Sequence, residues 1–133
     1  MITNFKEILL TDKEVRGMLA SLPNNGPFGK MVRINSDNSV KASVSVTSAE
    51  ISPQAEIHDN FNDLFIVLSG EEEVWVGGEI SDKREAEPGE WAGENLIGAR
   101  KHQLSKGDVL VIPKGMAHRH GLGSAALLII KTQ

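Results

Sequence analysis

The chain has 133 residues, which is enough for one hydrophobic core and too few for a second independent domain of usual size. Hydrophobic residues make up 40% and charged residues 24% of a composition with 13 Gly and 5 Pro, which excludes collagen-like, coiled-coil and wholly disordered proteins. Lys and Arg number 14 against 18 Asp and Glu, a net charge of -4, so we expect no nucleic-acid partner.

The first predicted element is a helix over residues 11–22. Thr11 and Glu14 form a capping-box pattern at its start, and Leu10 and Val15 occupy the two positions of a hydrophobic staple. A proline directly after the helix, followed by a turn sequence, ends it. Its apolar stripe predicts packing on the outside of the elements that follow, and its lack of clustered titratable groups favours a structural role.

The N-terminal segment that precedes this helix does not resemble an export signal. Lys6 and Glu7 interrupt the stretch that would have to be apolar, and no small-residue cleavage pattern follows. The longest strongly apolar run, residues 125–130, falls far short of the roughly 18 residues that suggest a membrane span. We therefore expect a cytoplasmic protein without a membrane partner.

A period of two replaces the helical period in the middle of the chain. Residues 40–47 alternate apolar with polar side chains, which is typical of a half-buried strand. More strand-like runs follow, separated by turns that contain Gly or Pro: residues 55–58, 63–69, 73–76, 108–112, 118–121 and 125–131. Many short strands with little helix predict a sandwich or a barrel. We expect residues 1–30 to form a helix and linker that pack on a barrel domain of residues 31–133.

Two of these runs contain stretches, residues 64–68 and 109–112, that are apolar on both faces of the predicted sheet. One face lines the interior, so the other must be covered by the N-terminal helix, a second sheet or a partner subunit. Exposed apolar strand faces of this kind are usually buried somewhere. We therefore expect a homodimer to cover part of this surface.

The least regular part of the sequence lies between residues 77 and 103. Within it, residues 81–90 are predicted to form a charged, proline-containing loop. A long excursion in a compact domain is often functional, whereas a run of charges is usually solvated. For the charged run we favour a solvated surface segment that Trp91 holds in place.

The absence of cysteine removes disulfides, Cys-based zinc sites and thiol nucleophiles, so any chemistry must use His, carboxylates or a metal. The most informative spacing is GDVLVIPKGMAH at residues 107–118, in which turns rich in Gly and Pro flank a strand and His118 opens the next strand. This stretch resembles the second motif of the cupin superfamily almost position for position. It departs from that motif at Leu122, which stands where the motif has Asn.

The first cupin motif is expected upstream, as two His one residue apart, then a Glu and a Gly. In AEIHDNFNDLFIVLSG, residues 55–70, an alignment on Gly70 places Asp63 at the Glu position. The same alignment places His58 at the second His position and Glu56 at the first, so the spacing is kept although residue types differ. Residues two apart in a strand point to one face, so Glu56 and His58 should enter the barrel together.

The resemblance implies an all-β fold, a cupin-type antiparallel β-barrel or double-stranded β-helix (jelly roll) with an N-terminal α-helix. It also implies a divalent transition metal, Fe, Mn, Zn or Ni, bound inside the barrel by the residues at the motif positions, Glu56, His58, Asp63 and His118. Asp63 is one methylene shorter than the usual Glu. If it falls short of the metal, two His and one carboxylate remain, the set of non-haem Fe(II) sites with open positions; if it reaches, the site carries two negative charges.

A metal-free pocket is the alternative interpretation, because many cupins have lost the metal and a substituted first motif fits such a loss. Glu56, His58 and His118 would then be hydrogen-bonding groups in a polar pocket. We favour metal binding, because isolated buried carboxylates are costly without a cation or a proton to neutralise them.

Two further residues are expected to face the interior. His120 shares the strand face of His118, so it could be a fourth ligand, a proton shuttle or a pocket residue. We favour a pocket position over ligation, and in an enzyme we assign His120 the role of general acid or base. Phe65 shares the strand parity of Asp63 and is expected to line the pocket.

Two functional hypotheses follow. The first is a metal-dependent enzyme, dioxygenase-, isomerase- or lyase-like, that acts on a small polar organic molecule. The second is a non-catalytic module that binds or senses a small ligand, such as a sugar or an organic acid, in a metal-free pocket. Open coordination positions are required by the first hypothesis, because water or substrate must occupy them. The fold alone does not decide between the two.

Overall fold

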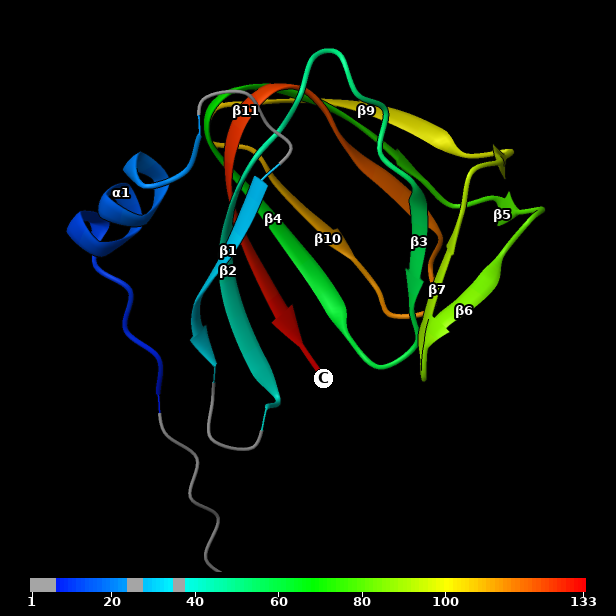
Figure 1. The fold of residues 1–133 in the computed structure, drawn as a ribbon, viewed down its shortest axis with the longest axis horizontal. Coiled ribbons are helices and arrows are strands. Elements are labelled where there is room, and N and C mark those ends of the chain that lie inside the picture. The colour runs from blue at the N-terminus through cyan, green and yellow to red at the C-terminus, as the bar shows by residue number, and fades with distance from the viewer. Residues whose placement is uncertain (1–6, 24–27, 35–37) are drawn as a thin grey trace, which may run out of the picture.

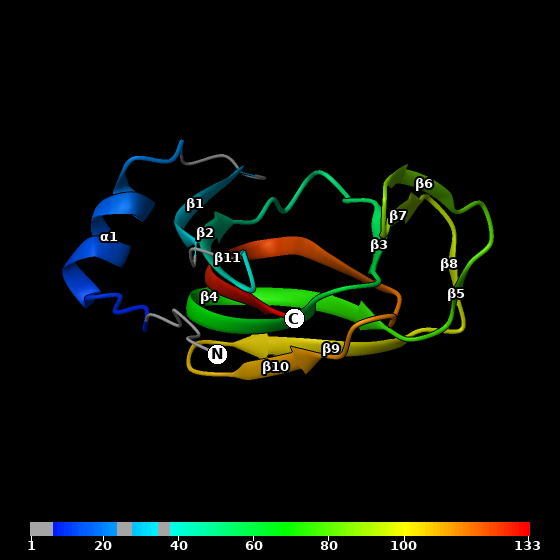
Figure 2. The same ribbon diagram turned by 90° about the horizontal axis from the view of Figure 1, so that it is seen from below.

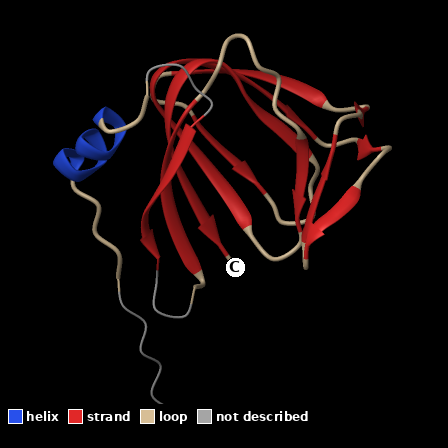
Figure 3. Ribbon diagram, in the orientation of Figure 1, coloured by secondary structure: helices blue, strands red, loops and turns tan. Residues whose placement is uncertain are grey.

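The computed structural model describes residues 7–23, 28–34 and 38–133. In these ranges strand is the dominant structure, and α1 is the helix (Figure 3). Most of the strands form one curled antiparallel sheet, with α1 outside it at one end (Figures 1 and 2). The all-β fold with an N-terminal helix is therefore confirmed. The elements are α1 (Asp12–Ala20), β1 (Phe28–Ile34), β2 (Val40–Val46), β3 (Ala55–His58), β4 (Asn62–Val76), β5 (Glu79–Ile80), β6 (Arg84–Glu87), β7 (Glu90–Gly93), β8 (Leu96–Ile97), β9 (Arg100–Ser105), β10 (Val109–Ile112) and β11 (His118–Thr132).

Helix α1 begins as its capping sequence predicts. The Thr11 side chain accepts a hydrogen bond from the Glu14 backbone N–H at 3.1 Å, and the helix ends at Ala20, slightly earlier than predicted. Val15 is buried, and Glu14 forms an ion pair of 2.5 Å with Arg33 of β1, so α1 packs against the outside of β1 and β2. Within the described ranges, no helix has the length and apolar character needed to span a membrane.

Two long strands, β4 and β11, run side by side through the middle of the sheet (Figure 1). The sequence predicted each of them as two shorter runs, whereas each continues through its glycine. Gly70 of β4 has a φ of 76°, and a Cβ there would overlap the backbone carbonyl oxygen of Ser124 on β11. Gly123 of β11, with a φ of 137°, approaches the backbone of Glu71 in the same way. These glycines bend two paired strands instead of ending them.

The hydrophobic core lies against the inner faces of β4 and β11. Val67, Val74 and Leu127 are almost completely buried there, and burying a side chain of this size contributes about 1.5–3 kcal/mol. The same two strands also carry the buried polar residues Asp63 and His118. The core cluster comprises Phe65, Val67, Val74, Val76, Leu104, Ile112, Ala125, Leu127 and Ile129.

Residues 77–103 form short strands, which corrects the prediction of a charged loop. β6 pairs with β7, β5 pairs with β8, and β9 returns along β4. Every residue of β6 is exposed, so the charged run is solvated as predicted although it is a strand. Because both faces of β6 lie in water, its sequence shows no apolar period of two. Next to it on β7, Trp91 donates its Nε1–H to Asp59 at 3.0 Å, which ties this hairpin to the turn after β3.

The outer face of the sheet is covered in part. Val15 and Leu19 of α1 line one side of a groove, and Leu68 on the outer face of β4 lines another side. On β10, Val109 and Val111 remain 57% and 56% exposed. The N-terminal helix therefore covers one part of the apolar outer face and leaves the β10 part in solvent.

Candidate metal centre

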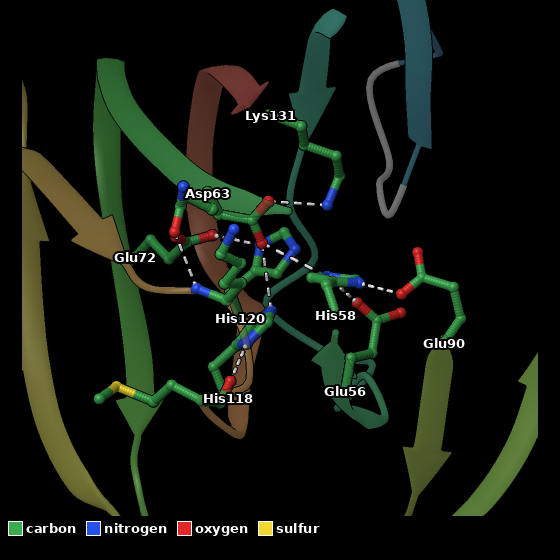
Figure 4. A network of polar contacts seen from close by, with 11 residues as sticks. Glu56, His58, Asp63, Glu72, Glu90, His118, His120 and Lys131 are labelled. Carbon is green, nitrogen blue, oxygen red and sulfur yellow. Dashed lines mark hydrogen bonds and ion pairs between the residues drawn. The ribbon is translucent and has the colours of Figure 1, made fainter. Parts of the chain in front are cut away.

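Three potential metal ligands meet inside the curled sheet (Figure 4). Glu56 and His58 lie two residues apart on β3, and His118 begins β11 directly opposite Glu56 in the strand register. One ligand atom from each residue lies within 4.8 Å of the ligand atoms of the other two. The shared strand face brings Glu56 and His58 together, and the pairing of β3 with β11 adds His118.

His58 lies among carboxylates. Its Nδ1 is 2.6 Å from Glu90 Oε2, and its Nε2 is 3.3 Å from Asp63 Oδ2 and 3.5 Å from Glu56 Oε2. Burial lowers the pKa of His58, but the bonds to Asp63 and Glu90 outweigh it, so that its pKa lies above 6.5. The bond from Nδ1 to Glu90 leaves Nε2 directed at the space shared with Glu56 and Asp63.

His118 is almost fully buried, and among the described residues it makes one hydrogen bond. Its Nδ1 lies 3.1 Å from the Met116 carbonyl oxygen, which can only accept, so Nδ1 carries the proton and Nε2 offers a lone pair. Nε2 is buried without a hydrogen-bond partner among the described residues. Burial lowers the pKa of His118 to about 4, which keeps the ring neutral at pH 7. An imidazole fixed through one nitrogen and free at the other is suited to metal ligation.

Asp63 joins the two imidazoles to a lysine. Oδ2 lies 3.3 Å from His58 Nε2 and 3.5 Å from His118 Nε2, while Oδ1 lies 2.7 Å from Lys131 Nζ. Burial raises the pKa of Asp63, but the contacts with His58 and Lys131 outweigh it and lower that pKa to about 2. The carboxylate is therefore ionised and faces the site with one oxygen, despite its shorter side chain.

The other two residues expected to face inward do so. Phe65 is 1% exposed, and its ring centroid lies 4.5 Å from that of His120. His120 lies 6.4 Å from His118 between ring centroids, and its Nδ1 is 3.6 Å from Oε2 of Glu72. Glu72 is 0% exposed and accepts the Gly121 backbone N–H at 3.0 Å. A buried carboxylate, Glu72, thus lies next to His120, and His120 in turn lies between it and the three potential ligands.

Sequence reasoning missed Glu72, Glu90 and Lys131. Glu90 stands at the end of the run predicted as a loop, and Glu72 in an acidic stretch between two predicted strands. Lys131 ends an apolar strand run, where a lysine is usually solvated. Its parity with Leu127 and Ile129 was the available signal, because side chains two apart share a face.

The donor set suits a borderline divalent ion. Two imidazole nitrogens and a carboxylate oxygen are ligands of Fe(II), Mn(II), Zn(II) and Ni(II), and three protein ligands leave coordination positions for water or substrate. The orphaned Nε2 of His118 fits such an ion, because no other described group satisfies it. Both imidazoles are also fixed from behind: Nδ1 of His58 is hydrogen-bonded to Glu90, and Nδ1 of His118 to the Met116 carbonyl oxygen.

Comparisons with known proteins find the fold and no sequence family. No family profile matches the chain, and no curated protein matches it either. Among solved structures, a protein with a double-stranded beta-helix domain from Klebsiella pneumoniae matches with a TM-score of 0.62 at 18% identity, over 96% of this chain and 90% of that one. A cupin-2 domain containing protein from Shewanella frigidimarina matches with a TM-score of 0.58 at 15% identity, over 89% and 91% of the two chains.

An enzyme of the same fold is also similar. The DMSP lyase DddQ from Ruegeria pomeroyi matches with a TM-score of 0.56 at 15% identity, over 80% of this chain and 46% of the lyase. At these identities the likeness concerns the fold. The curled antiparallel sheet and these structures agree, and the chain has the double-stranded β-helix fold that the cupin-2 domain protein and the other matching structures share.

Proposed function

We propose that the protein is a metal-dependent enzyme that binds a divalent transition metal through Glu56, His58 and His118 and acts on a small polar organic molecule. The orphaned Nε2 of His118 carries the proposal. This lone pair lies 3.5 Å from the ionised carboxylate of Asp63, so two electron-rich atoms face each other in a buried site. A cation between them would satisfy both.

A bound divalent ion would supply Lewis-acid polarisation or oxygen activation at its open positions. Proton transfer and the shielding of the site would be carried out by side chains of the protein. His120 lies within the same interior and can hold or move a proton, and the buried Glu72 Oε2 lies 3.6 Å from its Nδ1, near enough to favour a proton on that nitrogen. The buried ring of Phe65 packs at an angle of 49° against His120 and forms an apolar wall on that side. A lyase is among the solved structures with this fold, and a lyase-like reaction is one of the three that the resemblance implies.

Elemental analysis of untagged protein purified without chelator tests the metal. We expect stoichiometric metal in the parent protein and none in a His58→Ala/His118→Ala double variant. His102→Ala is the matched control, because His102 is exposed on β9, and it should retain the metal. Parent protein that is metal-free and fails to bind added Fe(II), Mn(II), Ni(II) or Zn(II) would contradict the proposal.

A metal-free binding module is the second candidate, and the surroundings of His58 favour it. With a raised pKa and three carboxylates nearby, a protonated His58 can supply the positive charge that a metal would otherwise bring. In that case sugars or organic acids should raise the unfolding temperature of the protein in excess chelator. A ligand that stabilises only the metal-loaded protein would support the enzyme.

We also propose a homodimer that covers Val109 and Val111 of β10. Both side chains are more than half exposed on an outer face that α1 leaves open, and apolar strand faces favour a partner. Sedimentation should give twice the chain mass of 14.4 kDa for the parent and a monomer for a Val109→Lys/Val111→Lys variant. Ile97→Lys, at an exposed position on β8, is the control that should stay dimeric. A monomeric parent protein would contradict this assembly.

A further inference from the structure

Lys131 places a positive charge inside the candidate metal centre. On β11 it shares the inner face with Leu127 and Ile129, and its register partner on β4 is Asp63. The side chain therefore turns toward the interior, where its Nζ lies 2.7 Å from Asp63 Oδ1 (Figure 4). A lysine held in this way is part of the site and not a solvated surface residue.

Asp63 divides its two oxygens between Lys131 and the imidazoles. Oδ1 bonds to the ammonium group, and Oδ2 faces Nε2 of His58 and of His118. The group of atoms that lie within 4.8 Å of one another consists of Glu56, His58 and His118, without Asp63. The carboxylate at the fourth position is thus engaged by a cation that belongs to the chain.

The ion pair between Lys131 and Asp63 makes the net charge of the site less negative. Glu56 and Asp63 together would balance a divalent ion bound by two neutral imidazoles. Lys131 cancels one of these negative charges and places a like charge next to any bound cation, and such interactions are strong in a buried site.

Resting on the proposed function, we infer that Lys131 sets the metal affinity of this centre by competing with the ion for Asp63. The ion is held mainly by Glu56, His58 and His118, and it is bound more weakly than the four residues could bind it. Lys131 thereby determines the number of protein ligands and the number of positions open to substrate.

If Lys131 supported metal binding instead of competing with it, its removal would change the metal affinity in the opposite direction. If Lys131 supported the metal by orienting Asp63 as a ligand, its removal would weaken binding by roughly 10- to 100-fold, as for other outer partners of metal ligands. If Lys131 competes with the metal, its removal frees the charge of Asp63 and strengthens binding. The direction of the change in affinity therefore decides between the two roles.

Chelator competition with Zn(II) and with Mn(II) measures the affinity of the parent and three variants. Lys131→Met should bind each ion more tightly by at least roughly tenfold. Lys131→Arg, which keeps the charge, should stay near the parent affinity. Lys101→Met is the matched control, because Lys101 loses the same charge on β9 outside the site, where it pairs with Glu73, and its affinity should not change.

Lys131→Met removes the ammonium partner of the buried Asp63 carboxylate and could prevent folding, so a double variant without net charge change keeps the test valid. Asp63→Asn/Lys131→Met removes both members of the pair. Competition predicts parent-like affinity for this protein, whereas a ligating Asp63 predicts a marked loss. As a second measurement, saturating Zn(II) should raise the unfolding temperature of Lys131→Met more than that of the parent.

The outcomes separate this inference from the proposed function. A parent protein that binds metal, with Lys131→Met equal or weaker, overturns the competition and leaves the metal site intact. Tighter binding by Lys131→Met together with parent-like binding by the double variant supports it. If the parent and every variant bind no metal, the proposed function and the inference both fail.

Discussion

The two imidazoles of the candidate centre have opposite surroundings, although their ring centroids lie only 5.0 Å apart. His58 lies on the rim side, where three carboxylates approach its two nitrogens. His118 lies on the core side, near the ring of Phe65, with one bond to a backbone carbonyl. Burial lowers the pKa of both rings, but the carboxylates outweigh it at His58, whose pKa is raised, whereas the pKa of His118 falls to about 4.

Each side therefore contributes a different property to the site. The rim concentrates negative charge, which attracts a cation, and the core side presents a neutral nitrogen in a fixed direction. Changes on the core side should act through packing and protonation and be large. Changes on the rim should act through charge and be smaller.

The largest effect is expected from Phe65→Ala on the core side. Phe65 is buried against His118 and His120, so its loss leaves a cavity and should lower the free energy of unfolding by about 3–5 kcal/mol. Urea denaturation measures this value. A loss below about 1 kcal/mol, the size expected for a surface substitution, would show that the interior is not packed around this ring.

The pH dependence of stability should differ in sign between the two imidazoles. The pKa of His118 is about 4 in the folded protein against 6.5 when unfolded, so the unfolded state binds more protons in this interval. His118 therefore contributes stability that is present above pH 6.5 and is lost as the pH falls toward about 4, with a total of about 3 kcal/mol. The raised pKa of His58 gives the opposite slope, because its contribution is present below pH 6.5 and is lost as the pH rises.

Urea unfolding between pH 4 and pH 6.5 measures the slope due to His118, and unfolding above pH 6.5 measures the slope due to His58. His118→Asn keeps a donor for the Met116 carbonyl and should flatten the loss of stability on acidification. His58→Asn should leave that loss in place and should remove the fall in stability that the parent shows as the pH rises above 6.5. Equal slopes in the two variants would contradict the division between rim and core.

Glu90→Gln should have a moderate effect confined to the rim. It replaces the carboxylate that holds Nδ1 of His58 at 2.6 Å, so the pKa of His58 should fall, and that of His118 should rise by less because the charge on His58 lowers it. Loss of such an outer partner weakens metal binding by roughly 10- to 100-fold. NMR titration of the imidazole signals and chelator competition measure both effects, and a larger shift at His118 than at His58 would contradict an effect confined to the rim.

The smallest effect is expected from Trp91→Phe. This change removes the Nε1–H bond to Asp59 at the exposed edge of the rim while keeping most of the ring contact, and a bond of this kind contributes about 1 kcal/mol or less. Thermal unfolding measures the change. A loss similar to that of Phe65→Ala would mean that the rim is as important for stability as the core.

Local rules predicted the parts of the molecule that depend on near neighbours in the chain. The common face of Glu56 and His58 follows from strand parity, and the position of His118 follows from the turn before it. Lys131, Glu72 and the strand character of β6 depend on which distant strands pair, and this register is not visible in a local pattern. The long strands were missed for a related reason, because a glycine that bends a strand looks in the sequence like one that ends it.

Gly70 and Gly123 have a consequence for folding specificity. Their backbones meet the opposite strand so closely that a slip of β4 against β11 by one residue would press a side chain of Ser69 or Glu71 into that contact. Such a slip would also turn Asp63 from the interior to the outer face, since a shift of one residue reverses every side chain of a strand. The two glycines therefore select one register of β4 against β11, and the polar interior depends on a close backbone contact at residues that carry no side chain.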